Sequence, residues 1–193
     1  MNPSISRAVM LAATIATIAI RWPHGARRYS VRVTRSLRTG RERALMGAAV
    51  IGLIILLIWV VTPAFAFADF TLHPAPFIAG VACVVVSLWL FHRSHVDLGL
   101  NWSPTLEMRD SHQLVTGGIY RAIRHPMYTS LLLYGIGQAL VVPNWFAGPF
   151  YLAAMGTLVA LRLGVEERMM LDAFGDRYAA YMSHTKRLIP GIW

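Results

Sequence analysis

Five long apolar segments constrain the fold of this chain more than any other feature of its sequence. They cover residues 8–20, 44–67, 76–91, 127–142 and 145–163. A helix needs about 20 apolar residues to cross a bilayer core, and in lipid an open sheet would leave its backbone groups unpaired. We therefore expect an all-α integral membrane protein with about five transmembrane helices.

The composition agrees with this expectation. Of the 193 residues, 56% are hydrophobic, which is more than soluble domains usually carry. The length suits one compact bundle, so we expect a single domain over residues 1–193. The last two apolar segments lie so close in the chain that we expect a tight helical hairpin there.

The distribution of positive charge predicts how these helices are oriented. If all five segments span, 17 of the 18 Lys and Arg residues lie on one side, in 21–43, 92–125 and the tail from 162. Cytoplasmic loops are enriched in Lys and Arg. We therefore expect an inner (plasma) membrane protein with its N-terminus outside. The net charge of +9 then has a topological cause, with membrane lipids and no nucleic acid as partners of the arginines.

Several kinds of chemistry find no support in the residues. The single cysteine, Cys83, lies in an apolar run and excludes an internal disulfide, a multi-cysteine zinc site and an iron–sulfur cluster. His92 and His95 lie three residues apart, but no further candidate ligands accompany them, so we expect no metal. Nucleophile-elbow, zinc-protease, phosphate-loop and dinucleotide-binding motifs do not occur.

The stretch GGIYRAIRHPMY, residues 117–128, concentrates polar groups at the start of an apolar segment. Its two glycines permit a tight turn or the close approach of a ligand. Pro126 suits the first turn of a helix, which places His125 at the helix entrance and Tyr128 in the first turn. The free N–H groups there form a ready site for a carboxylate or phosphate. The alternative is a belt of Tyr and Arg residues at the membrane interface around a plain loop.

The stretch ALRLGVEERM supplies a second group of ionisable residues. Arg162 and Glu166 lie four residues apart and share one helix face, whereas Glu167 points elsewhere. Charged groups at the end of a span are costly unless they are paired or functional. The two interpretations are a structural Arg162–Glu166 ion pair, or a cation and an acid that face the same pocket as His125.

The segment after the fifth span has the pattern of an amphipathic helix. Met170, Phe174, Tyr178 and Tyr181 recur at helical spacing between charged residues. We expect this C-terminal helix to lie on the cytoplasmic face. It would serve either as a cover over a site or as a simple anchor.

These motifs together resemble one family. The run DLGLNWSPTLEMRDSHQLVTGGIYRAIRHPMY, then RxxxEE from Arg162 to Glu167, then FGDRYAAYMSHTKRLIP, resembles the isoprenylcysteine carboxyl methyltransferase family, especially its small prokaryotic members. The likeness covers roughly residues 91–190. RHPxY alone is shared with phospholipid methyltransferases and some sterol reductases, whereas its combination with LGxNWS, HxLV and RxxxEE is more specific.

The resemblance implies a membrane-buried methyltransferase that uses S-adenosyl-L-methionine, with its cofactor region in residues 92–126 and 162–193 on the cytoplasmic side. It implies that Arg162 is the catalytic residue facing the methyl acceptor. It implies cofactor contacts at His112, Gln113, Leu114, Val115, Tyr120, His125, Pro126, Met127, Tyr128 and Glu166.

The expected reaction is carboxyl O-methylation of an isoprenylcysteine-like molecule, a lipophilic or prenylated substrate. A carboxylate acceptor is already ionised and needs no general base, and the planar fork of Arg162 suits a carboxylate. The alternatives are a phospholipid or other lipid N-, O- or S-methyltransferase, an NADPH-dependent membrane reductase, and a non-enzymatic membrane protein. Because the Arg162 cation suits an acidic acceptor, it favours carboxyl O-methylation over methylation of an amine.

Overall fold

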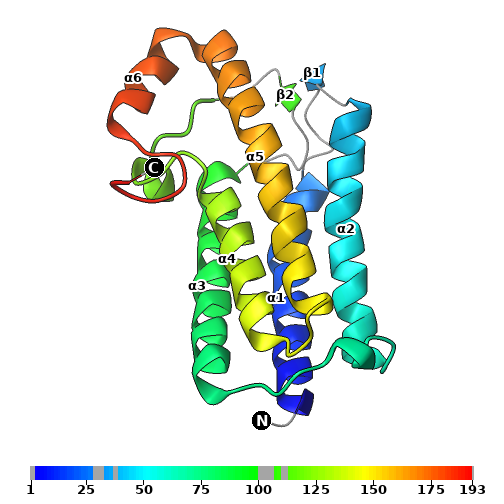
Figure 1. Ribbon diagram of the computed structural model, residues 1–193. Coiled ribbons are helices and arrows are strands. Elements are labelled where there is room, and N and C mark those ends of the chain that lie inside the picture. Colours follow the sequence, from blue (N-terminus) through cyan, green and yellow to red (C-terminus); the bar gives the residue numbers. More distant parts are fainter. Residues whose placement is uncertain (1–2, 28–32, 37–38, 100–106, 110–112, 193) are drawn as a thin grey trace.

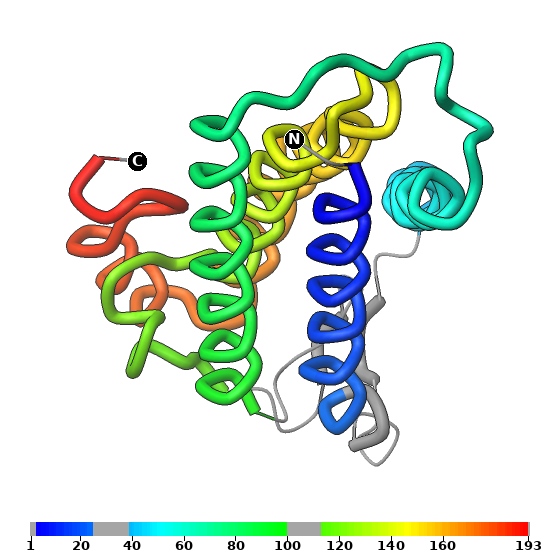
Figure 2. The backbone as a smooth tube through the Cα atoms, turned by 90° about the horizontal axis from the view of Figure 1, so that it is seen from below, coloured from blue at the N-terminus to red at the C-terminus, as the bar shows by residue number. Residues whose placement is uncertain are grey.

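The computed structural model describes residues 3–27, 33–36, 39–99, 107–109 and 113–192. Within these ranges, five helices run side by side along the molecule (Figure 1). They are α1 (Pro3–Arg27), α2 (Gly40–Val61), α3 (Pro74–Leu98), α4 (Pro126–Val141) and α5 (Ala147–Phe174). Figure 2 shows α1 and α3 side by side, with α2 at the edge of the bundle.

The remaining elements cap the two ends of this bundle. The end opposite the N-terminus carries α6 (Asp176–His184), the 3-10 helix η4 (Gly118–Arg121) and a short antiparallel pair, β1 (Val33–Ser36) with β2 (Glu107–Arg109) (Figure 1). The other end carries the 3-10 helix η2 (Ala66–Ala68). The strand pair lies in stretches that the apolar pattern leaves outside the spans.

Of the helices in the described part of the chain, four are long and apolar enough to cross a membrane: α1 over Pro3–His24, α2, α3 and α5. This confirms the prediction of a helical, multi-pass membrane protein. The helix α4 has 16 residues and packs between α3 and α5. Because α4 is shorter than the roughly 20 residues that a span needs, the count of five transmembrane helices stays a prediction.

The region after the fifth predicted span differs from the prediction. The helix α5 continues past residue 163 to Phe174, with Arg162 and Glu167 paired to protein partners, and where the span itself ends stays a prediction. The single amphipathic helix predicted after it is divided at Gly175, whose φ of +51° is a left-handed conformation that glycine adopts readily. Met170 and Phe174 therefore belong to α5, and Tyr178 and Tyr181 to α6.

Close helix contacts hold α4 in place. At the crossing of α3 and α4, a Cβ atom on Gly80 would lie 2.9 Å from the carbonyl oxygen of Gly137, so the two backbones approach as only glycine permits. The predicted tight hairpin between α4 and α5 is confirmed. Asn144 closes it, because its Oδ1 accepts from the Ala147 backbone N–H at 2.7 Å. These contacts fix the position of α4, whose first turn carries the candidate site.

Candidate active site

A cavity of about 370 Å³ lies among the five long helices and reaches the end that carries η4 and α6. It collects most of the residues singled out in the sequence: Gln113, Leu114, Val115, Tyr120, His125, Met127, Tyr128, Arg162 and Glu166. Pro126 is not part of the cavity wall but occupies the first turn of α4, as predicted. His112 lies outside the described residues.

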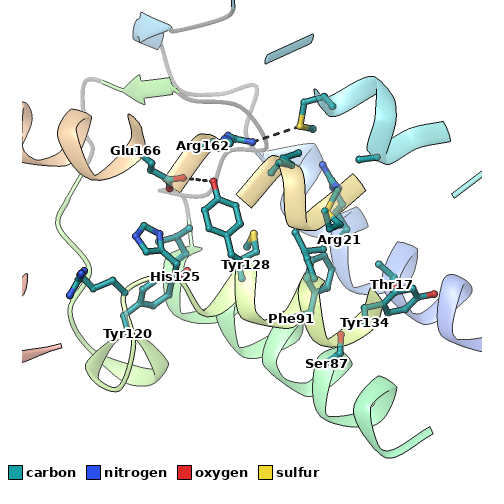
Figure 3. Close-up of a pocket in the computed structure, with 18 of the residues that line it drawn as sticks. Thr17, Arg21, Ser87, Phe91, Tyr120, His125, Tyr128, Tyr134, Arg162 and Glu166 are labelled. Atoms are coloured by element: carbon teal, nitrogen blue, oxygen red, sulfur yellow. Dashed lines mark hydrogen bonds between the residues drawn. The ribbon is translucent and has the colours of Figure 1, made fainter. Parts of the chain in front are cut away.

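The first turn of α4 faces the polar stretch of α5. The Tyr128 hydroxyl donates a hydrogen bond to the carboxylate of Glu166 (Figure 3). His125 stands at the N-terminus of α4 and its ring stacks on that of Tyr128, with centroids 5.6 Å apart and planes 18° apart. The predicted positions of His125 and Tyr128 at the helix entrance are thus confirmed. The site offers a carboxylate beside two aromatic rings at a helix N-terminus.

Arg162 has a different partner from the one that its spacing suggests. Its Nη2 lies 3.5 Å from the Glu42 carboxylate. Its Nη1 lies 3.7 Å from the Met46 sulfur, the contact drawn as the dashed line from Arg162 in Figure 3. Arg162 is only 8% exposed and Glu42 7%. The two residues of the RxxxE pattern therefore reach two different helices, since Arg162 contacts α2 and Glu166 contacts α4.

Glu42 is a residue that sequence reasoning missed. It lies in the first turn of α2, where its backbone N–H donates to the Thr39 hydroxyl at 3.2 Å. Its arginine-rich surroundings in the sequence are typical of a plain cytoplasmic loop. The Thr-x-x-Glu spacing from Thr39 to Glu42 is the pattern of a helix N-terminus, and this signal could have extended the helix to include Glu42.

Glu167, to which the sequence assigned no role, is the centre of a buried ionic cluster. Its side chain is 4% exposed. The Glu167 carboxylate accepts from Arg124 Nε at 3.0 Å and from Arg187 Nη2 at 2.8 Å, and His125 Nε2 lies 3.4 Å away. The cluster joins α5 to the RHPxY segment and to the chain that follows α6.

Backbone hydrogen bonds reinforce this attachment. The Arg124 N–H donates to the Lys186 carbonyl at 2.8 Å, and the His125 N–H donates to the Arg187 carbonyl at 3.0 Å. The Arg124 guanidinium also donates to the Thr185 carbonyl. Because the C-terminal segment runs along the RHPxY segment in this way, it holds the entrance of α4 in place.

The helix α6 covers the cavity, and its buried side carries Tyr178 and Tyr181. The Tyr181 hydroxyl donates to the Tyr120 carbonyl oxygen. Burial raises the pKa of Tyr181 to about 12. Burial, and then the charge of Glu166, raise the pKa of Tyr120 well above its ordinary value. Both hydroxyls therefore stay protonated at physiological pH, and of the two predicted uses of this segment the contacts favour a cover.

The start of η4 depends on glycine. Gly118 has a φ of +60°, and a Cβ atom there would collide with the Asp97 carboxylate. Asp97 accepts from the Ile119 N–H at 2.8 Å and pairs with Arg93 at 3.0 Å. The prediction that this glycine pair permits a tight turn is confirmed for Gly118, and the turn brings Tyr120 to the cavity.

Comparisons with known proteins point to one family. The model of a family described as phospholipid methyltransferase matches residues 75–177. A protein-S-isoprenylcysteine O-methyltransferase of Tribolium castaneum is 34% identical over 86 residues, covering 45% of this chain and 31% of that protein. The Homo sapiens protein of the same name is 27% identical over 117 residues, covering 60% of this chain and 41% of that protein.

A solved structure has a similar fold. It is described as the eukaryotic intramembrane Ras methyltransferase ICMT (isoprenylcysteine carboxyl methyltransferase), and it matches with a TM-score of 0.63 at 23% identity. The match covers 100% of this chain and 69% of that one. The two curated relatives are matched over less than half of their length. The resemblance to isoprenylcysteine carboxyl methyltransferases is confirmed, whereas the closer likeness to prokaryotic members stays a prediction.

Proposed function

The chain belongs to the phospholipid methyltransferase family, and from this premise we propose that it is a methyltransferase that uses S-adenosyl-L-methionine. Its acceptor is a lipophilic molecule, and the reaction is carboxyl O-methylation of an isoprenylcysteine-like group. One observation carries this proposal: the same cavity inside the bundle contains both the Glu166 carboxylate and the Arg162 guanidinium.

The residues present fit the cofactor. Glu166 has lone pairs beyond those used by Tyr128 and would accept from the ribose hydroxyls. The positive end of the α4 helix dipole, beside His125, would attract the cofactor's carboxylate. Apolar walls for the adenine come from Leu114 and Val115. The cavity volume lies within the roughly 300–1,000 Å³ usual for small-molecule sites. The proposed cofactor set is completed by His112, Gln113, Tyr120, Met127 and Tyr128.

Arg162 would hold the acceptor carboxylate. A guanidinium binds a carboxylate through two parallel hydrogen bonds, and such bonds are strong where water is excluded. Arg162 is almost fully buried and already lies beside the Glu42 carboxylate. An acceptor carboxylate would therefore bind the Arg162 guanidinium either together with Glu42 or in place of it.

The chain's own contribution to the reaction is positioning. When bound, the cofactor supplies an electrophilic methyl group on a sulfonium sulfur, and one oxygen of the ionised acceptor carboxylate takes it in line without any proton transfer. Holding two reactants in line removes much of the entropic barrier. Tyr178 and Tyr181 of α6 form part of the cavity wall, and a bound cofactor and acceptor would displace water from the reacting groups there.

The orientation in the membrane belongs to the same proposal. The α6 end of the cavity and the N-terminus lie at opposite ends of the bundle (Figure 1). Arg41 and Arg43, at the start of α2, belong to the arginine-rich segment 21–43. The excess of positive charge supports a cytoplasmic position for this end. The cofactor would enter from the cytoplasm and the lipophilic acceptor from the bilayer.

A phospholipid amine is the second candidate acceptor, because the matching family is described as phospholipid methyltransferase. Such an amine must react in its neutral form, through the lone pair of its nitrogen. A buried guanidinium would donate a hydrogen bond to that same lone pair and hold it away from the methyl group. Arg162 therefore favours the carboxylate.

A direct assay tests the proposal and separates the two acceptors. Purified protein in lipid nanodiscs is supplied with radiolabelled S-adenosyl-L-methionine and either N-acetyl-S-farnesylcysteine or phosphatidylethanolamine. We expect base-labile methyl ester on the first acceptor and no label on the second. Label on phosphatidylethanolamine alone would establish the second candidate.

Calorimetry separates the cofactor classes. We expect S-adenosylhomocysteine to bind and NADPH not to bind. Binding of NADPH alone would overturn the proposal in favour of a reductase. A folded protein that binds neither and methylates neither acceptor would favour a non-enzymatic role.

A further inference from the structure

The far end of the cavity, away from Glu166, is polar although it lies among transmembrane helices. The lining residues there include Thr14 and Thr17 of α1, Ser87 of α3, and Tyr134 and Gln138 of α4. Figure 3 shows Thr17, Tyr134 and Ser87 away from Glu166 and Arg162. Polar groups inside a membrane bundle are costly unless they are paired or functional. We call these five lining residues the inner polar end.

Three hydroxyl groups of the inner polar end donate their protons to backbone carbonyls. Thr14 donates to the Met10 carbonyl at 2.8 Å, and Thr17 donates to the Ala13 carbonyl at 2.9 Å. Ser87 donates to the Ser130 carbonyl at 2.8 Å. A hydroxyl has one proton and two lone pairs. These three oxygens can therefore only accept a further hydrogen bond.

The hydroxyl proton of Tyr134 is also used within the protein. Its hydroxyl oxygen lies 3.4 Å from Thr14 Oγ1. Because the proton of Thr14 points to the Met10 carbonyl, Tyr134 is the donor in this pair. The phenolic oxygen of Tyr134 is thus left with its acceptor capacity.

Gln138 supplies the strongest indication of a ligand. Its side chain is 0% exposed, and its Nε2 donates to the Ala147 carbonyl at 2.9 Å, which fixes the orientation of the amide. Its Oε1 has no hydrogen-bond partner among the described residues. A buried carbonyl oxygen without a partner is costly, so a bound donor would be strongly favoured here.

We propose that the inner polar end binds a hydroxyl group carried at the far end of the lipophilic acceptor, with Gln138 Oε1 as its main acceptor. This inference rests on the proposed function, because it concerns the acceptor of the same cavity. It narrows the substrate class from a plain hydrocarbon chain to an amphiphile that is polar at both ends. With a rise of 1.5 Å per residue, Gln138 lies about 15 Å along α4 from Tyr128, which sets the scale of that chain.

Binding of two matched probes tests the proposal without any methyl transfer. Protein in phosphatidylcholine nanodiscs is titrated with dodecanoic acid or with its terminal ω-hydroxy derivative. The melting temperature of the protein is measured at each probe concentration, and the half-saturating concentration is taken from its increase. We expect the hydroxylated probe to bind at least about tenfold more tightly, the equivalent of about 1.4 kcal/mol. Equal affinities would overturn the proposal.

Variants test whether the preference for the hydroxylated probe arises at the inner polar end. The two probes partition into lipid unequally, but this difference is the same for every variant and cancels when their affinity ratios are compared. Gln138→Met removes the carbonyl, and we expect the affinity ratio of the two probes to fall toward one. Gln138→Glu, neutral in this buried position, keeps one donor and one acceptor, and we expect it to retain the preference. Ile136→Val changes an exposed residue of α4 and should leave the ratio unchanged.

Tyr134→Phe keeps the aromatic ring and removes one acceptor, so it provides a second measurement if Gln138→Met does not fold. A ratio that is the same in wild type, Gln138→Met and Tyr134→Phe would show that the hydroxyl binds elsewhere, and a resident water would then be the partner of Gln138. If the hydroxyl preference holds but no acceptor is methylated, the proposed function fails and the binding site stands.

Discussion

At the scale of single residues, Arg162 and Glu166 lie one turn apart on α5 but contact different helices. Arg162 lies beside Glu42 of α2, whereas Glu166 accepts from Tyr128 of α4. Their separation assigns them separate tasks in the proposed reaction, since one faces the acceptor and the other the cofactor. Substitution of each residue should therefore affect a different measurement.

Replacement of Arg162 by alanine is expected to abolish methyl transfer while the affinity for S-adenosylhomocysteine stays within a few fold. The reason is that Arg162 would bind the acceptor carboxylate and not the cofactor. Activity is measured with radiolabelled cofactor, and affinity by calorimetry on the same preparation. Arg168→Ala is the matched control, because Arg168 is an exposed cation on the same helix and is not part of the cavity wall. Equal loss of activity and cofactor affinity in Arg162→Ala would contradict the assigned role.

Replacement of Glu166 by glutamine is expected to weaken binding of S-adenosylhomocysteine by about 1–3 kcal/mol, the usual cost of losing a charged hydrogen bond. The amide keeps the size of the side chain but not its negative charge. Calorimetry measures the affinity, and the melting temperature of the unliganded protein reports on folding. Unchanged affinity in a folded variant would reassign Glu166 to a structural contact with Tyr128.

At the scale of elements, the site depends on contacts between segments that are distant in the chain. The helix α2 brings Glu42 to Arg162 of α5. The segment after α6 attaches to the RHPxY segment through Glu167. Neither contact follows from helix periodicity, because each joins the side chain of one element to a partner that only packing brings near.

Glu42 is expected to compete with the acceptor for Arg162. In Glu42→Gln the guanidinium loses a charged neighbour, so the KM for a carboxylate acceptor should fall by up to about tenfold, the equivalent of about 1.4 kcal/mol. Steady-state kinetics measure this, with Arg41→Gln as a control at an exposed position of the same helix turn. A higher KM would show that Glu42 positions Arg162 instead of competing for it.

Glu167 is expected to be the most important ionic residue for stability among these contacts. Glu167→Gln leaves Arg124 buried without its carboxylate, and breaking a buried pair costs roughly 3–5 kcal/mol. Arg187→Ala should cost less, because the Arg187 side chain is 37% exposed and water can replace the pair. Melting temperatures of the two variants in one detergent compare the costs. Equal effects would contradict a buried ionic cluster.

At the scale of the whole molecule, the bundle places the proposed reaction at one end and the N-terminus at the other (Figure 1). The cavity extends from the reaction end to the inner polar end among α1, α3 and α4. A cofactor from the aqueous side and a lipophilic acceptor from the bilayer can thus meet in one cavity. This arrangement requires the end with α6 to face the cytoplasm.

Cysteine labelling tests that orientation. In a Cys83→Ser background, we expect Ser183→Cys, exposed on α6, to react with a membrane-impermeant maleimide only in inverted vesicles. Phe67→Cys, exposed in η2 at the opposite end, should react only in right-side-out vesicles. The reverse pattern would place the proposed active site outside.

The sequence by itself determined the features that depend on local composition. Apolar segments and the placement of arginines predict a helical, multi-pass membrane protein, because the cost of placing a residue in lipid depends mainly on its own side chain. The RHPxY segment predicts the start of α4, because Pro126 acts through its own backbone. The RxxxEE spacing indicated Arg162 and Glu166 as candidate site residues.

Only the tertiary structure decided which side chains meet. Thr14 and Tyr134 lie 120 residues apart in the sequence, and Arg124 and Glu167 lie 43 apart. Such pairs form when helix packing brings two faces together, and hydropathy carries no information about that choice. The partner of Arg162 and the acceptor oxygens of the inner polar end follow from packing, since their energies depend on neighbours supplied by other helices.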